Sequence, residues 1–383
     1  MKNVKKNVNY IYAEYLYILG IALFLFSRLY RYSLIIDISG ITTSIIRLIS
    51  FSFMIPNVVF NNYNRKEIYL IVFLYFLSII CILFGGDKSL ILYPTILCGF
   101  KNVNIKRTIN ILFILTLSCL LLHLFVFIID YVTKNKEFFS MFHFTGRYNE
   151  VGVFEKNTIM FADNNMFGIR TVCCVMEYMY LTNRNNHRYF KALILFVLSI
   201  VLLLITQSRT SFIMSILLVS YMVIENIHVF NKNVVLIRNI SIIGSVSSSI
   251  LLTNIVLWNN SISIRIDSLL SGRPSVFNKV YNYLGINILP KISKFNSMSK
   301  VFGTYMLPDN SYISVFFKWG LAISILIFIL TYIFINSNKN EIIIDYFISI
   351  LAIWFIIEFI SMEVVMYFVP LIIMSNYFNK EKK

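Results

Sequence analysis

Charged residues are scarce in this chain of 383 residues, where they make up 14% of the sequence. A typical soluble domain carries roughly 25% charged residues. Hydrophobic residues make up 58% of the chain. Lipid solvates apolar side chains but not charges, so this composition predicts helices that face a bilayer. It also excludes a separate soluble domain, and we expect residues 1–383 to form one membrane domain.

Motifs for metals and nucleotides are also lacking. The sequence has no H-x-x-x-H or C-x-x-C spacing and neither a G-x-x-x-x-G-K-[ST] nor a G-x-G-x-x-G motif. We therefore expect no metal and no cofactor. The five cysteines lie within apolar stretches, which predicts buried thiols. Basic residues open the chain, but no small-residue cleavage site follows, so the first apolar run is expected to remain as an anchor.

What the chain does have is a succession of apolar runs separated by polar breaks. About 20 apolar residues cross a bilayer. The predicted fold is all-α, a polytopic transmembrane helix bundle with about 12 spans and a large outer loop between the ninth and tenth. The predicted spans are 10–27, 38–60, 67–84, 88–100, 108–131, 159–182, 190–206, 209–226, 236–257, 310–335, 342–358 and 362–377. The last two are separated so briefly that one broken helix is an alternative.

The distribution of lysine and arginine predicts the orientation. With the amino terminus inside, the inner segments hold 17 basic residues and the short outer loops hold four. Short cytoplasmic loops are enriched in such residues. Both termini are therefore predicted to lie in the cytoplasm. Because the net charge of +16 is placed in this way, it favours a membrane over nucleic acid as the partner.

Two outer loops are long, 132–158 and 258–309, and together they carry ten basic residues. Long loops are translocated regardless of charge, so they do not oppose this topology. Two explanations of the basic residues stay open. They contact anionic lipid headgroups, or they bind an anionic substrate such as a lipid pyrophosphate.

The sixth predicted span contains an unusual set of charges. Asp163, Arg170 and Glu177 are seven residues apart, nearly two helical turns, so they form one stripe. Charged side chains in a membrane face the bundle interior or a cavity. A structural network between helices and a substrate cavity near Asp163 are both compatible with the stripe.

The segment 206–211 forms a tight outer turn between two apolar runs. Ser208 is a candidate N-cap, which places Arg209 in the first turn of the next helix. A cation is unfavourable there unless an anion joins it, and helix-start N–H groups with an arginine make a phosphate site. The alternative is an arginine that simply reaches the membrane surface.

Four segments of the chain, at residues 145–320, resemble the O-antigen polymerase and O-antigen ligase superfamily. The first three are similar to the family's R…G-x-F…D-x-N-x-x-G stretch, its S-R-[GT] turn and its G-R segment. The fourth is similar to H-N-x-[YFL]…G, except that an aspartate replaces the histidine, which favours a polymerase over a ligase. The segments are Gly146-Arg147 with Gly152-Val153-Phe154 and Asp163-Asn164-Asn165-Met166-Phe167-Gly168; Ser208-Arg209; Gly272-Arg273; and Asp309-Asn310-Ser311-Tyr312 with Gly320.

The resemblance implies a metal-independent membrane glycosyltransferase in the bacterial inner membrane. It would polymerise undecaprenyl-diphosphate-linked repeat units into O-antigen or capsular polysaccharide. Its partners would be the lipid-linked glycan donor and acceptor, the bilayer, and a chain-length regulator and flippase of the same pathway. The implied catalytic residues are Arg209, Arg273 and Asp309, with Asp309 the candidate base. The implied substrate-binding residues are Arg147, Arg265, Asp163, Asn165, Arg170 and Asn310.

Three other functions remain open from the sequence. The nearest is the ligase reaction of the same superfamily. A flippase for lipid-linked oligosaccharides also has about twelve spans, but it is expected to show two similar halves, and this chain shows no internal repeat. An accessory membrane subunit would have no evident use for clustered outer arginines.

Overall fold

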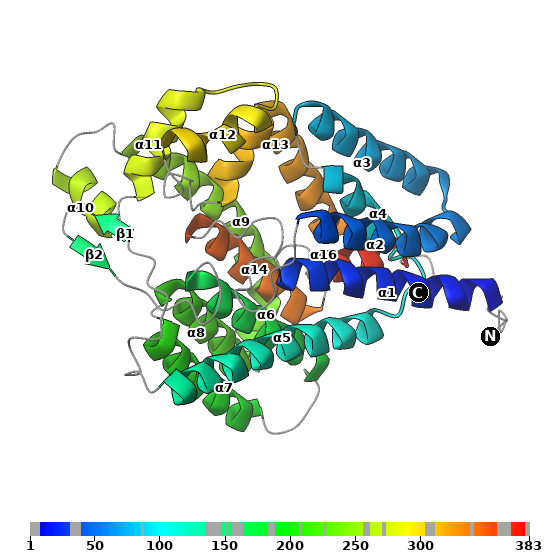
Figure 1. The fold of residues 1–383 in the computed structure, drawn as a ribbon, viewed down its shortest axis with the longest axis horizontal. Coiled ribbons are helices and arrows are strands. Elements are labelled where there is room, and N and C mark those ends of the chain that lie inside the picture. Colours follow the sequence, from blue (N-terminus) through cyan, green and yellow to red (C-terminus); the bar gives the residue numbers. More distant parts are fainter. Residues whose placement is uncertain are drawn as a thin grey trace.

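A computed structural model describes residues 8–30, 40–85, 88–134, 147–149, 152–154, 164–182, 188–206, 208–225, 227–255, 261–269, 273–302, 311–337, 341–357 and 369–379. The elements run in the order α1 (Val8–Leu29), α2 (Gly40–Phe60), α3 (Arg65–Leu83), the 3₁₀ turn η1 (Lys88–Ile91), α4 (Leu92–Cys98), α5 (Ile105–Lys134), β1 (Arg147–Asn149), β2 (Gly152–Phe154), α6 (Asn164–Thr182), α7 (Arg188–Thr206), α8 (Arg209–Ile224), α9 (His228–Ile255), α10 (Ser261–Leu269), α11 (Arg273–Leu284), α12 (Ile292–Phe302), α13 (Ser311–Ser337), α14 (Ile342–Ile357) and α16 (Val369–Phe378) (Figure 1).

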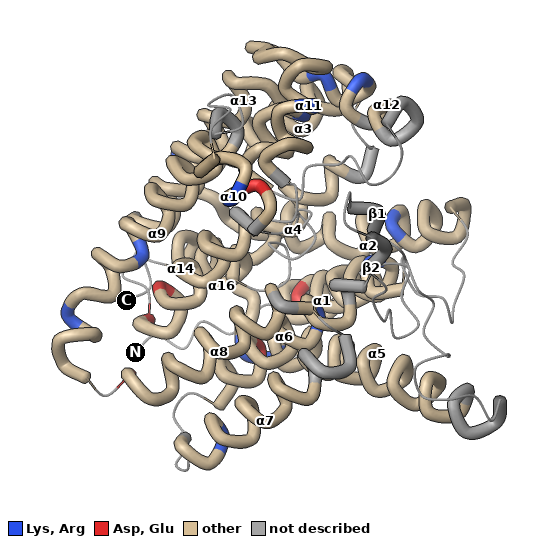
Figure 2. The backbone as a smooth tube through the Cα atoms, turned by 90° about the vertical axis from the view of Figure 1, so that its left-hand side faces the viewer, with Lys and Arg blue, Asp and Glu red and all other residues tan. Residues whose placement is uncertain are grey.

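The described chain is almost entirely helical, and its only strands form the short antiparallel pair β1–β2. Six described helices are long and apolar enough to cross a membrane, and four more are apolar but shorter. Figure 2 shows how few charged positions interrupt them. The prediction of a helical membrane protein is confirmed at this level, while the count of about 12 spans stays a prediction. The six are Tyr10–Leu29, Gly40–Phe60, Arg65–Leu83, Ile105–Ile129, His228–Leu252 and Ser311–Asn336.

The predicted fourth span, 88–100, has a different structure. It consists of η1 followed by α4, a helix of only 7 residues. A membrane-crossing helix needs about 20. Five of the seven side chains of α4 are buried, because the helix packs between neighbours and does not face lipid. The chain nevertheless returns to the end of α2, where the Asn57 side-chain amide donates to the Gly99 carbonyl over 2.5 Å.

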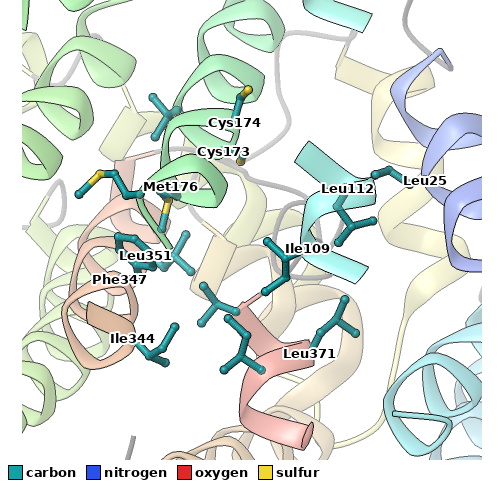
Figure 3. Close-up of a cluster of buried hydrophobic side chains, with 14 of the residues drawn as sticks. Leu25, Ile109, Leu112, Cys173, Cys174, Met176, Ile344, Phe347, Leu351 and Leu371 are labelled. Carbon is teal, nitrogen blue, oxygen red and sulfur yellow. The ribbon is translucent and has the colours of Figure 1, made fainter. Parts of the chain in front are cut away.

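The main core joins helices that are far apart in the sequence (Figure 3). Buried apolar side chains from α1, α5, α6, α14 and α16 meet there, which brings the two ends of the chain into one bundle. Dispersion contacts hold such a core in lipid, since burial of apolar groups against each other gains little over contact with acyl chains. Labelled members are Leu25, Ile109, Leu112, Cys173, Cys174, Met176, Ile344, Phe347, Leu351 and Leu371.

One end of the bundle is joined by a cluster of asparagines and an ion pair, which we call the asparagine cluster: Asn57, Asn61, Glu67, Lys101 and Asn102. Asn61 donates to the Lys101 carbonyl over 3.0 Å, and Asn102 donates to the Asn61 side chain over 2.7 Å. Lys101 pairs with Glu67 at 2.5 Å. The cluster therefore ties the end of α2, the start of α3 and the turn before α5 together.

Segments near both termini of the chain lie next to the asparagine cluster. The Asn104 backbone N–H donates to the Glu14 carboxylate of α1 over 2.9 Å. The Asn102 N–H donates to the side chain of Asn379, just after α16, over 3.4 Å. Burial raises the pKa of the Tyr63 phenol in the α2–α3 turn beside this cluster. The start of α1 and the end of α16 thus lie near each other (Figures 1 and 2).

A second polar cluster is centred on Arg238 of α9, which is 2% exposed. Its guanidinium pairs with Asp345 of α14 at 2.5 Å and also donates to Asn336 of α13 and to Asn239. In the sequence, Arg238 is one of the 17 basic residues assigned to the inner side of the membrane, with no further role. The structure places it in a buried ion pair at the point where α9, α13 and α14 meet.

We predict that Arg238→Ala lowers the free energy of unfolding by about 3–5 kcal/mol, because Asp345 would remain as a buried charge without its cation. Denaturation of the purified protein in mixed micelles measures this loss. Lys232→Ala, which removes an exposed cation from the same helix, serves as the control and should change little. The double variant Arg238→Met with Asp345→Leu should recover most of the stability. An Arg238→Ala protein as stable as wild type would contradict this arrangement.

Candidate functional site

Two buried charges of α6 face the interior of the bundle, as the seven-residue spacing predicts. Arg170 is 3% exposed and Glu177 is 0% exposed. Arg170 donates to the Arg28 carbonyl over 3.4 Å and to the Cys119 sulfur over 3.9 Å. Asp163, the third member of the predicted stripe, lies outside the described residues. The stripe therefore joins α6 to the end of α1 and the middle of α5.

Arg28 is a member of this site that the sequence did not identify. It directly follows the first predicted span, 10–27, so it was one of the four basic residues assigned to short outer loops. It lies in the last turn of α1 and is 5% exposed. Its guanidinium donates to the Tyr93 hydroxyl over 3.2 Å and lies 5.3 Å from the centre of the Phe24 ring. Two arginines from different helices are thus buried together where α1 ends.

His123 of α5 was also missed, because an isolated histidine carries no recognisable spacing. It is 0% exposed, and its Nδ1 lies 2.7 Å from the Cys119 carbonyl one turn earlier. The Tyr30 ring lies 5.9 Å from the imidazole ring. The available signal was the pair Cys119 and His123, two ionisable residues one helical turn apart on an apolar helix. The polar interior near Arg170 thus contains a histidine as well as two arginines.

Glu177 lies nearly two turns after Arg170 along α6. Its carboxylate interacts with the Thr116 hydroxyl of α5, although no hydrogen bond of standard geometry forms among the described residues. A buried carboxyl is costly in a membrane helix, and such groups commonly serve function.

The start of α6 packs closely on the start of α8. A Cβ atom placed on Gly168 would lie 2.5 Å from the Ser211 Oγ and 3.5 Å from the Ser208 Cβ. Glycine is needed here because no side chain fits between the two helices. This contact brings together two sequence segments that are forty residues apart, Asp163–Gly168 and Ser208–Arg209.

Ser208 occupies the N-cap position of α8, as predicted, but its side chain does not cap the helix. Its backbone is extended, and its hydroxyl donates to the Ser211 Oγ over 3.0 Å instead. No acidic residue lies in the first turn of α8. Arg209 is the first residue of α8, and a basic residue in a first turn is unfavourable to the helix dipole unless an anion joins it.

The segment 258–309, predicted to be a large outer loop, contains three short helices, α10, α11 and α12. The sequence predicted no helix there because the segment has no long apolar run. Arg265 is exposed on α10, and Arg273 begins α11. The Asp267 carboxylate accepts from the Ser275 backbone N–H at 2.9 Å and from the Ser275 hydroxyl at 2.6 Å. Asp267 thus caps α11 and holds Arg265 and Arg273 on linked helices.

The remaining predicted residues are placed only in part. Arg147 lies in β1 opposite Phe154 of β2, and Asn165 lies in the first turn of α6. Asp309 and Asn310 lie outside the described residues. The structure therefore places Asn165, Arg170 and Arg209 in the first two turns of the neighbouring helices α6 and α8. The Asp267–Ser275 contact joins the two helices that carry Arg265 and Arg273.

Metal-binding chemistry has no evident ligand set in the described part of the chain, where no group of three or more His, Cys, Asp or Glu side chains could hold an ion. The five cysteines are buried free thiols. The polar groups of the described site are the buried Arg28 and Arg170, His123, Glu177 and the hydroxyls of Ser208 and Ser211. The arginines and the helix-start N–H groups of α8 suit an anionic ligand.

No protein-family model, curated protein or solved structure matches this chain.

We predict that Gly168→Ala lowers the free energy of unfolding by about 1–3 kcal/mol, because the added methyl group overpacks the contact between α6 and α8. Thermal denaturation in detergent measures it. Gly244→Ala in α9, where nothing lies within 4 Å of the added Cβ, is the control and should leave stability equal or slightly higher. Adding Ser211→Gly should restore part of the loss. A Gly168→Ala protein that melts like wild type would show that the helices are not this close.

Proposed function

We propose that this chain is a membrane-embedded glycosyltransferase of the O-antigen polymerase and ligase superfamily. In this proposal it polymerises undecaprenyl-diphosphate-linked oligosaccharide repeat units at the outer face of a bacterial inner membrane. Both termini lie in the cytoplasm, and the product is O-antigen or capsular polysaccharide.

The contact at Gly168 is the observation that carries the proposal. Two of the four segments that resemble the superfamily meet there, although forty residues separate them in the sequence. Alternating spans place the starts of α6 and α8 at the same face, and the contact at Gly168 makes the two segments direct neighbours there. Arg170, two residues after the glycine, is buried beside Arg28, which adds positive charge where α1 ends.

The arrangement of the helix ends supports the proposed orientation. The asparagine cluster gathers the segments near 61–66 and 101–107 with the chain after α16. The positive-inside pattern assigns the same segments to the cytoplasm. The starts of α6 and α8 are then at the outer face, on the side where lipid-linked repeat units are polymerised.

Arg209 binds the pyrophosphate of the donor chain in this proposal, with the first N–H groups of α8 as further donors. Arg273, Arg265 and Arg147 assist from the outer loops. These donors stabilise the negative charge that develops on the diphosphate as it leaves. Asn165, Arg170 and Asp163 line the donor side at the start of α6.

The reaction is a substitution at the anomeric carbon of the donor. A hydroxyl of the incoming lipid-linked unit forms the new glycosidic bond, and the bond between the anomeric carbon and the diphosphate oxygen breaks. Asp309, with Asn310 beside it, is the candidate base that takes the hydroxyl proton. Cleavage of the glycosyl–diphosphate bond supplies the driving force, so no nucleotide is needed, and the proposed enzyme is metal-independent.

We predict that Arg209→Ala lowers polymerisation by about 100-fold or more, the usual effect of removing one charge-stabilising donor. The host gene is deleted and complemented with wild type, Arg209→Ala or the control Lys232→Ala, at matched protein levels. Surface glycan is then separated on a gel. Wild type and Lys232→Ala should give a full ladder, and Arg209→Ala should give a single repeat unit.

Other outcomes distinguish the alternatives. Long chains that accumulate on the lipid carrier in the deletion strain indicate a ligase. Loss of all outward-facing lipid-linked units indicates a flippase. A normal ladder with Arg209→Ala rejects the assigned role of that residue, and an unchanged ladder in the deletion strain rejects the glycan function.

A further inference from the structure

The segment between α11 and α12, residues 285–291, exposes apolar side chains in a loop predicted to lie outside the membrane. Ile286, Ile288 and Leu289 are 59%, 69% and 58% exposed. Single exposed apolar residues are ordinary, but three within four positions form a contiguous patch. We call these three residues the loop patch.

The backbone of this segment is held by a kink in α13. Gly320 has φ 75° and ψ 168°, a conformation outside the helical region. The kink leaves backbone N–H and C=O groups of α13 without partners inside the helix, and residues 285–291 form hydrogen bonds with them. Leu321 and Ala322 donate to the carbonyls of Asn287 and Ile288 over 2.8 and 3.2 Å, and Lys291 donates to the Lys318 carbonyl over 3.2 Å.

Gly320 is required at the kink for a second reason. A Cβ atom at this position would lie 2.6 Å from the Leu289 carbonyl oxygen. The Asn287 side-chain amide further satisfies the Leu284 and Gly285 carbonyls. Irregular backbone is tolerated at membrane depth only where protein satisfies its polar groups, and this segment meets that condition at each of these positions.

The loop patch continues the lipid-facing surface of α13. Ala322, which bonds to Ile288, is exposed, and the exposed residues Ile325, Ile329 and Ile333 follow it at helical spacing. On the other side, a Cβ on Gly85 at the end of α3 would lie 3.2 Å from Ser293, the second residue of α12. The patch therefore lies between two helices whose own apolar faces are exposed, and Figure 1 shows α3, α12 and α13 together.

The charges of the α11–α12 segment itself have one sign. Residues 273–302 contain Arg273, Lys279, Lys291, Lys294 and Lys300 but no Asp or Glu. Lys294 is exposed, and its ammonium lies 4.7 Å from the centre of the Tyr283 ring. Lysines and tyrosines next to an apolar patch are typical of the boundary between acyl chains and headgroups.

We propose that the α11–α12 hairpin lies at the water interface on the outer side of the membrane that α13 crosses. Its residues Ile286, Ile288 and Leu289 insert among the acyl chains of the outer leaflet. Lys291 and Lys294 contact the phosphates of the lipid headgroups. The lipid bilayer is thus a binding partner of the large outer loop itself. The inference depends on the membrane location of α13 and not on the proposed glycan chemistry.

The test uses the full chain in lipid nanodiscs, where both faces are accessible. Ile288→Cys carries the environment-sensitive fluorophore NBD, and Asn282→Cys, an exposed polar position of α11, is the matched control. Wild type gives the background from its five buried cysteines. Leu289→Cys provides a second position if Ile288→Cys does not fold.

NBD at Ile288 should emit at shorter wavelength than at Asn282. It should be quenched by phosphatidylcholine that carries a nitroxide high on its acyl chain, and iodide should quench it several-fold less than at Asn282. Equal iodide quenching at both positions would overturn the proposal. Protection from both quenchers would also overturn it, because protein, such as a second copy of the chain, would then cover the loop patch.

Discussion

The bilayer offers no hydrogen bonds, and the structure follows from this constraint. Each backbone group and each charge at membrane depth must find its partner within the protein. The asparagine cluster and the Arg238–Asp345 pair meet this demand at helix ends. The kink at Gly320 meets it for the segment between α11 and α12. Because apolar packing alone selects few partners in lipid, these polar contacts decide which helices lie together.

The same constraint gives the candidate site its character. Arg170 and Arg28 are buried where α6 meets the end of α1, and Arg209 begins α8 beside Gly168. Two buried arginines and the basic first residue of α8 favour an anion at this end of the bundle. A lipid-linked pyrophosphate has the required charge and enters from the bilayer. The loop patch would then place the large outer loop at the depth where the phosphates of such a lipid lie.

Much of the fold could be predicted because apolar runs are a local signal. The burial of Arg170 and Glu177 followed from their spacing, and the start of α8 at Arg209 followed from Ser208. Other features depend on contacts between distant residues. Arg238 and Asp345 are 107 positions apart, and hydropathy could not show that α4 is a short buried helix. Helices α10 to α12 are short and partly polar, so the sequence indicated only a loop. Arg28 was missed because nothing in its own segment distinguishes it, and His123 was missed because its only local signal was a cysteine one turn earlier.

The central claim is that this protein extends lipid-linked glycan at one face of the membrane. The most direct measurement reconstitutes the purified protein in lipid vesicles and adds a lipid-linked oligosaccharide repeat unit without nucleotide sugar and with a metal chelator present. We expect lipid-linked chains of two and more repeat units, with free lipid diphosphate released in proportion, and no extension with Arg209→Ala. Repeat units that remain single with the wild-type protein, under conditions in which it stays folded, would contradict the central claim.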